Sequence, residues 1–81
     1  MTQFELREIS VAPGGERPFA EADWRDALVL VERGEVEVEC LGGARCRFVE
    51  GDLLWLTGLP LRGLRNRGAC EALLIAVSRH R

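Results

Sequence analysis

The sequence predicts a small all-β domain, a sandwich or barrel of about seven or eight short strands. Three observations favour this class. Glycine and proline interrupt the chain at intervals of about 8–12 residues, which is the spacing of turns between short strands. Helical periodicity is weak along the whole chain, and residues 35–40 alternate strictly between glutamate and apolar side chains. The 81 residues suffice for one domain, 1–81, with a basic tail at 79–81.

The first half of the chain contains three segments with the character of strands. Residues 4–11 alternate loosely between polar and apolar side chains and predict the first strand, which a turn at 12–15 ends. Residues 16–26 are polar and irregular. Residues 27–31 are a continuous apolar run rich in β-branched side chains, which is typical of a strand buried on both faces. The alternation at 35–40 predicts a strand with valine or cysteine on one face and glutamate on the other.

Two registers are open for the hairpin that turns at residues 41–44. A two-residue loop would pair Cys40 with Arg45 and would place arginines on the apolar face. A three-residue loop matches apolar with apolar side chains and charges with opposite charges, so we predict this register. Its pairs are Cys40 with Cys46, Val38 with Phe48, and Glu39 with Arg47. Cross-strand cysteines can form a strained disulfide, but we expect two reduced core thiols here.

The second half of the chain continues the pattern of strands and turns. A turn at 51–52 precedes residues 53–56, which are apolar on both faces, and a loop follows at 58–60. Residues 61–66 alternate leucine and arginine around a glycine, and residues 71–78 form the last predicted strand.

Three of these segments, 27–31, 53–56 and 73–77, are apolar on both faces. A single small barrel needs only one apolar face per strand. The excess predicts that a second copy covers the other face, so we expect a homodimer.

Composition excludes several classes of protein. The net charge of −2 argues against a general nucleic-acid binder. No run of 18 apolar residues exists, so no membrane span is expected. The first residues lack a basic stretch followed by an apolar core, so no secretory signal is expected. The three cysteines have no Cys-x-x-Cys spacing, which predicts reduced, mostly buried thiols in a cytoplasmic protein.

Residues 31–38, the glycine pair at 42–43, and residues 49–56 together resemble the cupin superfamily. In that superfamily a strand that ends in glycine, a strand of glutamate and valine, and a Gly-Asp turn occur in this order. The resemblance covers residues 10–78. It implies a small double-stranded β-helix barrel, similar to a jelly roll, with a pocket inside the barrel. Cupins of this kind are commonly homodimers.

The metal-binding cupins carry two glycine-framed motifs, and the glycine frame is present here. Gly15 and Gly34 fit the first motif, Gly51 fits the start of the second, and Asn66 fits its final asparagine. The metal-ligand positions fall on Glu21, Asp23, Ala27 and Arg62. A one-residue change in spacing would move the first two positions onto Ala20 and Ala22.

These positions do not suit a metal ion. Arg62 cannot ligate, because a guanidinium is always protonated and has no lone pair to give. His80 is the one histidine and lies in the tail, outside both motifs. The resemblance therefore implies a cupin with neither metal nor other cofactor. The metal-dependent oxygenase and isomerase activities of the superfamily lose their basis.

Three interpretations are open for Arg62. It lies exposed on a solvated loop, or it forms an internal ion pair with carboxylates that converge on it. In the third interpretation Arg62 and Arg65 hold a small anion, with a tryptophan as an apolar wall. The candidate ligand-binding residues are accordingly Arg62, Trp24, Trp55, Glu21 and Asp23.

The function predicted from these features is that of a metal-free cupin module. We expect a homodimer that binds a small ligand in the barrel, with an anion as one option, or that serves as an accessory or sensor subunit. The alternatives are a purely structural dimer with a filled barrel and a metal-independent enzyme of the isomerase type. The enzyme is disfavoured, because the chain has no tyrosine and no histidine within the barrel, and no catalytic residue can be named.

Overall fold

The structure is a computed structural model that describes residues 3–18, 20 and 24–80. The described residues form eight β-strands, so the prediction of an all-β chain is confirmed. Their bounds are β1 Gln3–Val11, β2 Glu16–Pro18, β3 Ala27–Arg33, β4 Glu35–Cys40, β5 Arg45–Val49, β6 Leu53–Trp55, β7 Leu61–Arg65 and β8 Ala72–His80.

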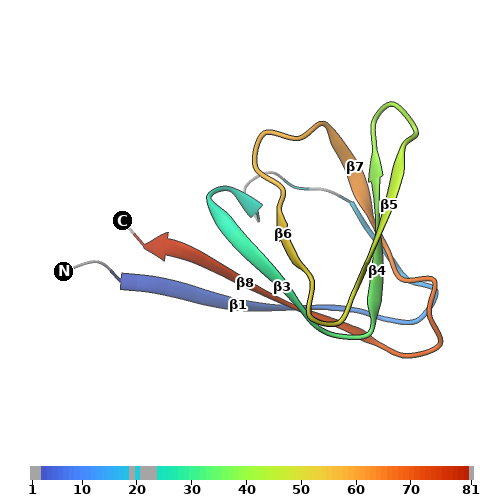
Figure 1. Ribbon diagram of the computed structural model, residues 1–81, viewed down its shortest axis with the longest axis horizontal. Helices are drawn as coiled ribbons and strands as arrows, with labels where there is room; N and C mark the ends of the chain where they lie inside the picture. Colours follow the sequence, from blue (N-terminus) through green and yellow to red (C-terminus); the bar gives the residue numbers. More distant parts are fainter. Residues whose placement is uncertain (1–2, 19, 21–23, 81) are drawn as a thin grey trace.

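The strands form two four-stranded antiparallel sheets (Figure 1). Sheet A has the order β1-β8-β3-β6, and sheet B has the order β2-β7-β4-β5. The chain follows the path of one long hairpin, in which β4 pairs with β5, β3 with β6, β2 with β7, and β1 with β8. Successive pairs alternate between sheets B and A. The outermost pair, β1 and β8, runs side by side toward one end of the molecule (Figure 1).

The core lies between the two sheets and is filled by apolar side chains. Alternation along each strand sends every second residue inward. Sheet A and sheet B both contribute to one contiguous cluster, and burying each large apolar side chain contributes about 1.5–3 kcal/mol to stability. The cluster contains Ile9, Trp24, Ala27, Val29, Val31, Val36, Val38, Leu54, Leu56, Leu61, Leu64, Leu74 and Ala76.

The outer face of sheet A is apolar and open in a single copy. The segments expected to be buried on both faces are buried on one face only. Leu28 is 44% exposed, Leu53 61% and Trp55 54%. The outer side chains of residues 73–77 are half-buried. The second apolar face that the sequence indicated is therefore present, and none of the residues that the structure describes covers it.

The prediction of the register between β4 and β5 is wrong by two residues. The hairpin loop has three residues as predicted, but it spans 41–43, so that Cys40 lies opposite Ala44. Gly43 has φ +95°, the left-handed conformation that the last residue of a three-residue loop adopts. The predicted loop would have placed Ala44 in this conformation, which an alanine adopts only with strain. The observed pairs are Val36 with Phe48, Val38 with Cys46, Glu37 with Arg47, and Glu39 with Arg45.

The cysteines are reduced as predicted but differ from the prediction in their pairing and burial. All three are free thiols, and Cys40 and Cys46 are not cross-strand partners. Cys46 and Cys70 are exposed rather than buried. Cys46 lies on β5, which is the edge strand of sheet B, so its inward side is not covered as the central strands are.

Strand β2 was not expected from the polar, irregular character of residues 16–26. It is a three-residue edge strand that pairs with β7 and places Pro18 opposite Gly63. The close approach needs glycine, because a Cβ at position 63 would lie 2.8 Å from the carbonyl oxygen of Arg17. Three residues that include a proline carry no alternation from which a strand could be predicted.

Asn66 ties the end of β1 to the connection between β7 and β8. Its side chain is fully buried, and its amide nitrogen donates to the carbonyl oxygens of Val11 (2.9 Å) and Cys70 (2.8 Å). Its amide oxygen accepts a hydrogen bond from the backbone N–H of Gly68 (2.8 Å). A buried polar side chain is tolerated here because all three of these bonds are made.

Candidate functional site

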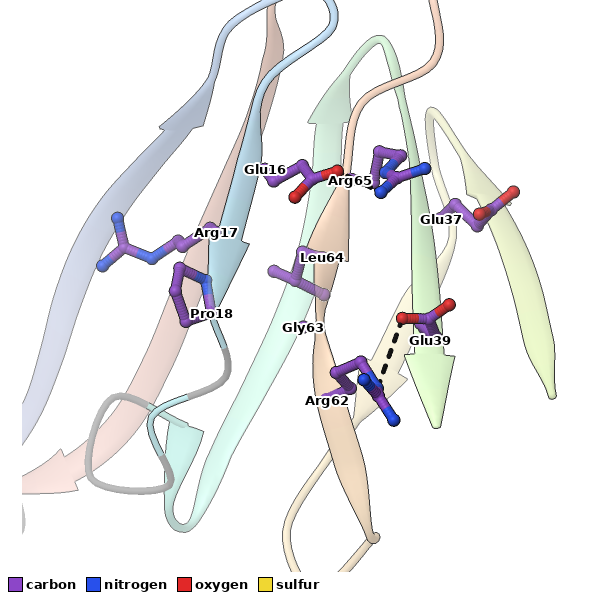
Figure 2. A pocket seen from close by; sticks show the side chains of 9 residues that line it. All are labelled: Glu16, Arg17, Pro18, Glu37, Glu39, Arg62, Gly63, Leu64 and Arg65. Carbon is purple, nitrogen blue, oxygen red and sulfur yellow. Dashed lines mark hydrogen bonds and ion pairs between the residues drawn. The ribbon is translucent and has the colours of Figure 1, made fainter. Parts of the chain in front are cut away.

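Arg62 lies on β7 at the outer surface of sheet B, outside the space between the sheets. Its side chain is 63% exposed, and its Nε lies 3.6 Å from Oε1 of Glu39 on β4 (Figure 2). The pairing of β4 with β7 is irregular at this point, because Glu39 lies opposite Gly63 while Cys40 lies opposite Leu61. Arg62 is the additional residue of this bulge, which turns its side chain toward solvent.

Arg62 belongs to a set of ion pairs that covers the outer face of sheet B. The alternation of β4 sends three glutamates outward, and arginines from β5, β7 and the following loop lie against them. The pairs are Arg45 with Glu39 (3.2 Å), Arg67 with Glu37 (3.1 Å), Arg47 with Glu35, and Arg65 with Glu16. Exposed ion pairs of this kind contribute about 0–1 kcal/mol each to the free energy of unfolding, so they add little to the stability of the fold.

A cleft of about 210 Å³ opens on this face beside Arg62 (Figure 2). Its charges balance, because Arg17, Arg62 and Arg65 are matched by Glu16, Glu37 and Glu39. Arg17 points away from the ion pairs (Figure 2). An anion bound here would have to displace Glu39 from Arg62 and Glu16 from Arg65.

The other predicted ligand-binding residues do not join Arg62. Trp24 is 1% exposed and packs in the core, and its indole Nε1 has no hydrogen-bond partner among the described residues. Trp55 is on the outer face of sheet A, away from sheet B. Neither tryptophan lines the cleft beside Arg62. The predicted residues Glu21 and Asp23 lie outside the described residues.

The described residues form no group of three or more histidine, cysteine, aspartate or glutamate side chains that could hold a metal ion. Of the positions that align with cupin metal ligands, Ala27 is fully buried in the core and Arg62 is on the outside of sheet B. These two positions do not converge on a common centre. No helix in the described part of the chain is long and apolar enough to cross a membrane.

The exposure of Arg62 leads to a stability prediction. We expect Arg62→Ala to change the free energy of unfolding by no more than about 0.5 kcal/mol, because an exposed pair at 3.6 Å is weak. Urea unfolding of the two proteins measures the difference. A loss of roughly 3 kcal/mol or more would show that Arg62 is the partner of a buried carboxylate instead.

A second surface lies on the outer face of sheet A, where the structure places the apolar excess that the sequence indicated. The outer face of sheet A has a cleft of about 370 Å³ lined by Phe4, Asp26, Leu28, Trp55, Val77 and Arg79. Asp26 has a left-handed φ of +54°, and its backbone N–H donates to Oγ1 of Thr57 (2.9 Å). The apolar residues of this surface had a signal in the sequence, since they supply the second apolar face. The two charged residues had none, because their positions depend on the pairing of β3 with β8.

Comparison of the sequence with models of known protein families and with curated proteins finds no match to either.

Proposed function

We propose that this chain is a metal-free cupin-type module that serves as an accessory or sensor subunit and catalyses no reaction of its own. The strand order supports the cupin-type assignment. Eight strands in two antiparallel sheets, paired as one long hairpin that alternates between the sheets, are the arrangement that a jelly roll requires. Gly34, Gly51 and Asn66, which fit the cupin motifs, occupy two left-handed turns and one buried hydrogen-bonded corner.

The observation that carries this proposal is the packing between the sheets. A cupin pocket lies inside the barrel, and here the corresponding space holds Trp24 and the apolar side chains of both sheets. The described strands form two separate sheets rather than a closed barrel, and the side chains of both sheets fill the space between them. Because side chains fill the interior, contacts with ligands or partner proteins have to form on the outer surfaces.

The residues available for catalysis support the same conclusion. The chain has no tyrosine and one histidine, His80, whose backbone pairs with Gln3 at the far end of β8. General acid–base catalysis needs two groups within hydrogen-bond reach of the reacting atoms. Among the described residues, Asn66 is the one buried residue of polar or charged type, and its hydrogen bonds are already made within the fold.

Thermal unfolding in the presence of added ligands tests this proposal. We expect neither divalent metal ions nor EDTA to move the melting temperature beyond experimental error. A ligand at 100 times its Kd adds about 2.7 kcal/mol, which would raise the melting temperature of a domain this small by roughly 10–20 °C. A saturable stabilisation by a transition metal, reversed by EDTA, would overturn the proposal.

A second candidate function is the binding of a small anion beside Arg62, and the cleft of about 210 Å³ favours it. The same thermal assay with phosphate and small carboxylates tests this candidate. Binding there predicts a stabilisation that Arg62→Ala and Arg65→Ala abolish and that Arg33→Ala, a change on strand β3, leaves intact. If none of these anions stabilises the protein, this second candidate is excluded and the first proposal, a module with a filled interior, is the one that stands.

A further inference from the structure

The outer face of sheet A carries a continuous apolar surface across all four strands. Leu6, Val77, Leu28 and Trp55 lie opposite one another in one row. Ile75, Leu30 and Leu53 form the next row on β8, β3 and β6. Leu6 is 68% exposed and Phe4, beside this row on β1, is 66% exposed. A contiguous apolar surface of this kind on a small protein marks an interaction site.

The border of this surface is polar. Arg79 and Asp26 lie at one end of the central strands, where they line the cleft with Phe4 and Trp55. Glu8 lies at the β1 edge, opposite Ile75. Among the described residues, neither Arg79 nor the carboxylate of Asp26 has an ion-pair partner. An apolar centre with a polar rim is the anatomy of a protein interface.

We propose that a second copy of this chain packs face to face on the outer surface of sheet A, about a two-fold axis that runs along the strands. Sheets pack face to face with their strands roughly aligned. A two-fold axis along the strands keeps the strand direction and reverses the strand order, so β8 lies over β3 and β1 over β6 of the other copy. Val77 then faces Leu28, and Leu6 faces Trp55.

The charges at the rim select this axis. Arg79 lies at the end of β8, and Asp26 immediately precedes β3 at the same end of the sheet. With the axis along the strands, Arg79 of each copy faces Asp26 of the other, and the symmetry makes this ion pair twice. With the axis across the strands, β8 lies over β8 and Arg79 is placed on Leu73, with no carboxylate opposite. The first arrangement gives an ion-pair partner to both Arg79 and Asp26, which have none among the described residues of one copy.

The size of the face sets the expected affinity. Four strands about 4.8 Å apart, whose lengths run from 3 residues in β6 to 9 in β1 and β8 at about 3.3 Å per residue, form a small interface. Specific interfaces near the lower size limit bind weakly. We therefore expect a dissociation constant in the micromolar range.

Sedimentation velocity of the full chain from about 5 to about 500 μM, which brackets micromolar dissociation constants, measures the association. We expect a species of twice the 9.0 kDa of one chain to increase with concentration. Trp55→Glu should leave only the single chain over the whole range. Leu41→Glu is the matched control, because Leu41 is 59% exposed in the loop of sheet B and its change should leave the dimer intact. Circular dichroism establishes that both variants are folded.

Two charge-reversal variants test the axis. Arg79→Asp and Asp26→Arg each place like charges opposite one another, so each alone should dimerise at least about tenfold more weakly, equivalent to about 1.4 kcal/mol. An equimolar mixture brings opposite charges together at both positions and should recover the dimer.

A single chain at the highest concentration, or a dimer that Trp55→Glu leaves intact, would overturn the proposed partner. A dimer that both reversals weaken but the mixture does not recover would overturn the proposed axis. A dimer that contains a metal ion would overturn the proposed function alone.

Discussion

Gly34→Ala is expected to lower the free energy of unfolding by at least about 3 kcal/mol, more than any other change of glycine to alanine in this chain. Gly34 forms the turn between β3 and β4 and has φ +78°. A Cβ at this position would lie 2.8 Å from the carbonyl oxygen of Glu71 and 3.0 Å from Cα of Ala72. Both atoms belong to the backbone, so the start of β8 would have to move away from the turn.

Changes at three other glycines distinguish the cost of the left-handed φ from the cost of the close backbone contact. Gly42 has neither a left-handed φ nor an atom within 4 Å of its Cβ position, so Gly42→Ala should cost less than about 0.5 kcal/mol. Gly51 has φ +94° with open space around it, and Gly51→Ala should cost about 1–2 kcal/mol. Gly63 has only the close contact with Arg17, and its edge strand β2 can shift, so we expect an intermediate cost. Urea unfolding of the four variants gives the order directly. A cost for Gly34→Ala no greater than that for Gly51→Ala would contradict the close packing of this turn against β8.

Asn66→Ala is expected to cost about 2–4 kcal/mol. The change removes the hydrogen-bond partner of the carbonyl oxygens of Val11 and Cys70 and of the N–H of Gly68. Each of these groups bonds to the Asn66 amide in the native fold. Removing one partner of a buried hydrogen bond costs the desolvation of the group that remains. Asn66→Asp, which keeps the shape but loses both amide donors, should also be strongly destabilising.

Arg67→Ala provides the control for this position, because Arg67 is the adjacent residue and its side chain is 50% exposed. It should change stability by no more than about 0.5 kcal/mol. Equilibrium unfolding in urea compares the three variants with the parent chain. If Asn66→Ala and Arg67→Ala had the same small effect, the corner between β1 and β8 would not depend on the amide.

The strands could be predicted where side-chain alternation is regular. The strict glutamate and valine pattern gave β4 its observed bounds, Glu35–Cys40, because one of its faces packs on the core and the other meets water. Residues 16–18 offered no such pattern, and β2 forms there because β7 provides an edge and Gly63 allows a close approach. Tertiary pairing of this kind leaves no trace in a three-residue segment.

The hairpin register shows the limit of matching side chains by type. The predicted and the observed registers differ by two residues, so both place apolar opposite apolar and glutamate opposite arginine. Side-chain period alone cannot separate them. The left-handed conformation of Gly43 decides between them, and the loop chemistry of the glycine pair at 42–43 held this information.

The candidate site could be predicted only in part. Arg62 depends on a bulge against β4, which alternation does not reveal, and the bulge places it on the outside of sheet B. Trp55 lies in a segment that is apolar on both faces, so its direction was undetermined until β6 paired with β3. The excess of apolar faces was visible in the sequence, and the outer face of sheet A is where it lies.

Elemental analysis of the protein purified without a chelator tests most directly whether this cupin-type module works without a metal. A structural zinc site binds its ion with about 10–16 kcal/mol, which is tight enough to retain the ion through purification. The filled interior predicts less than about 0.1 transition-metal ion per chain. About one ion per chain would contradict the proposal and would return a metal-dependent reaction to the leading position.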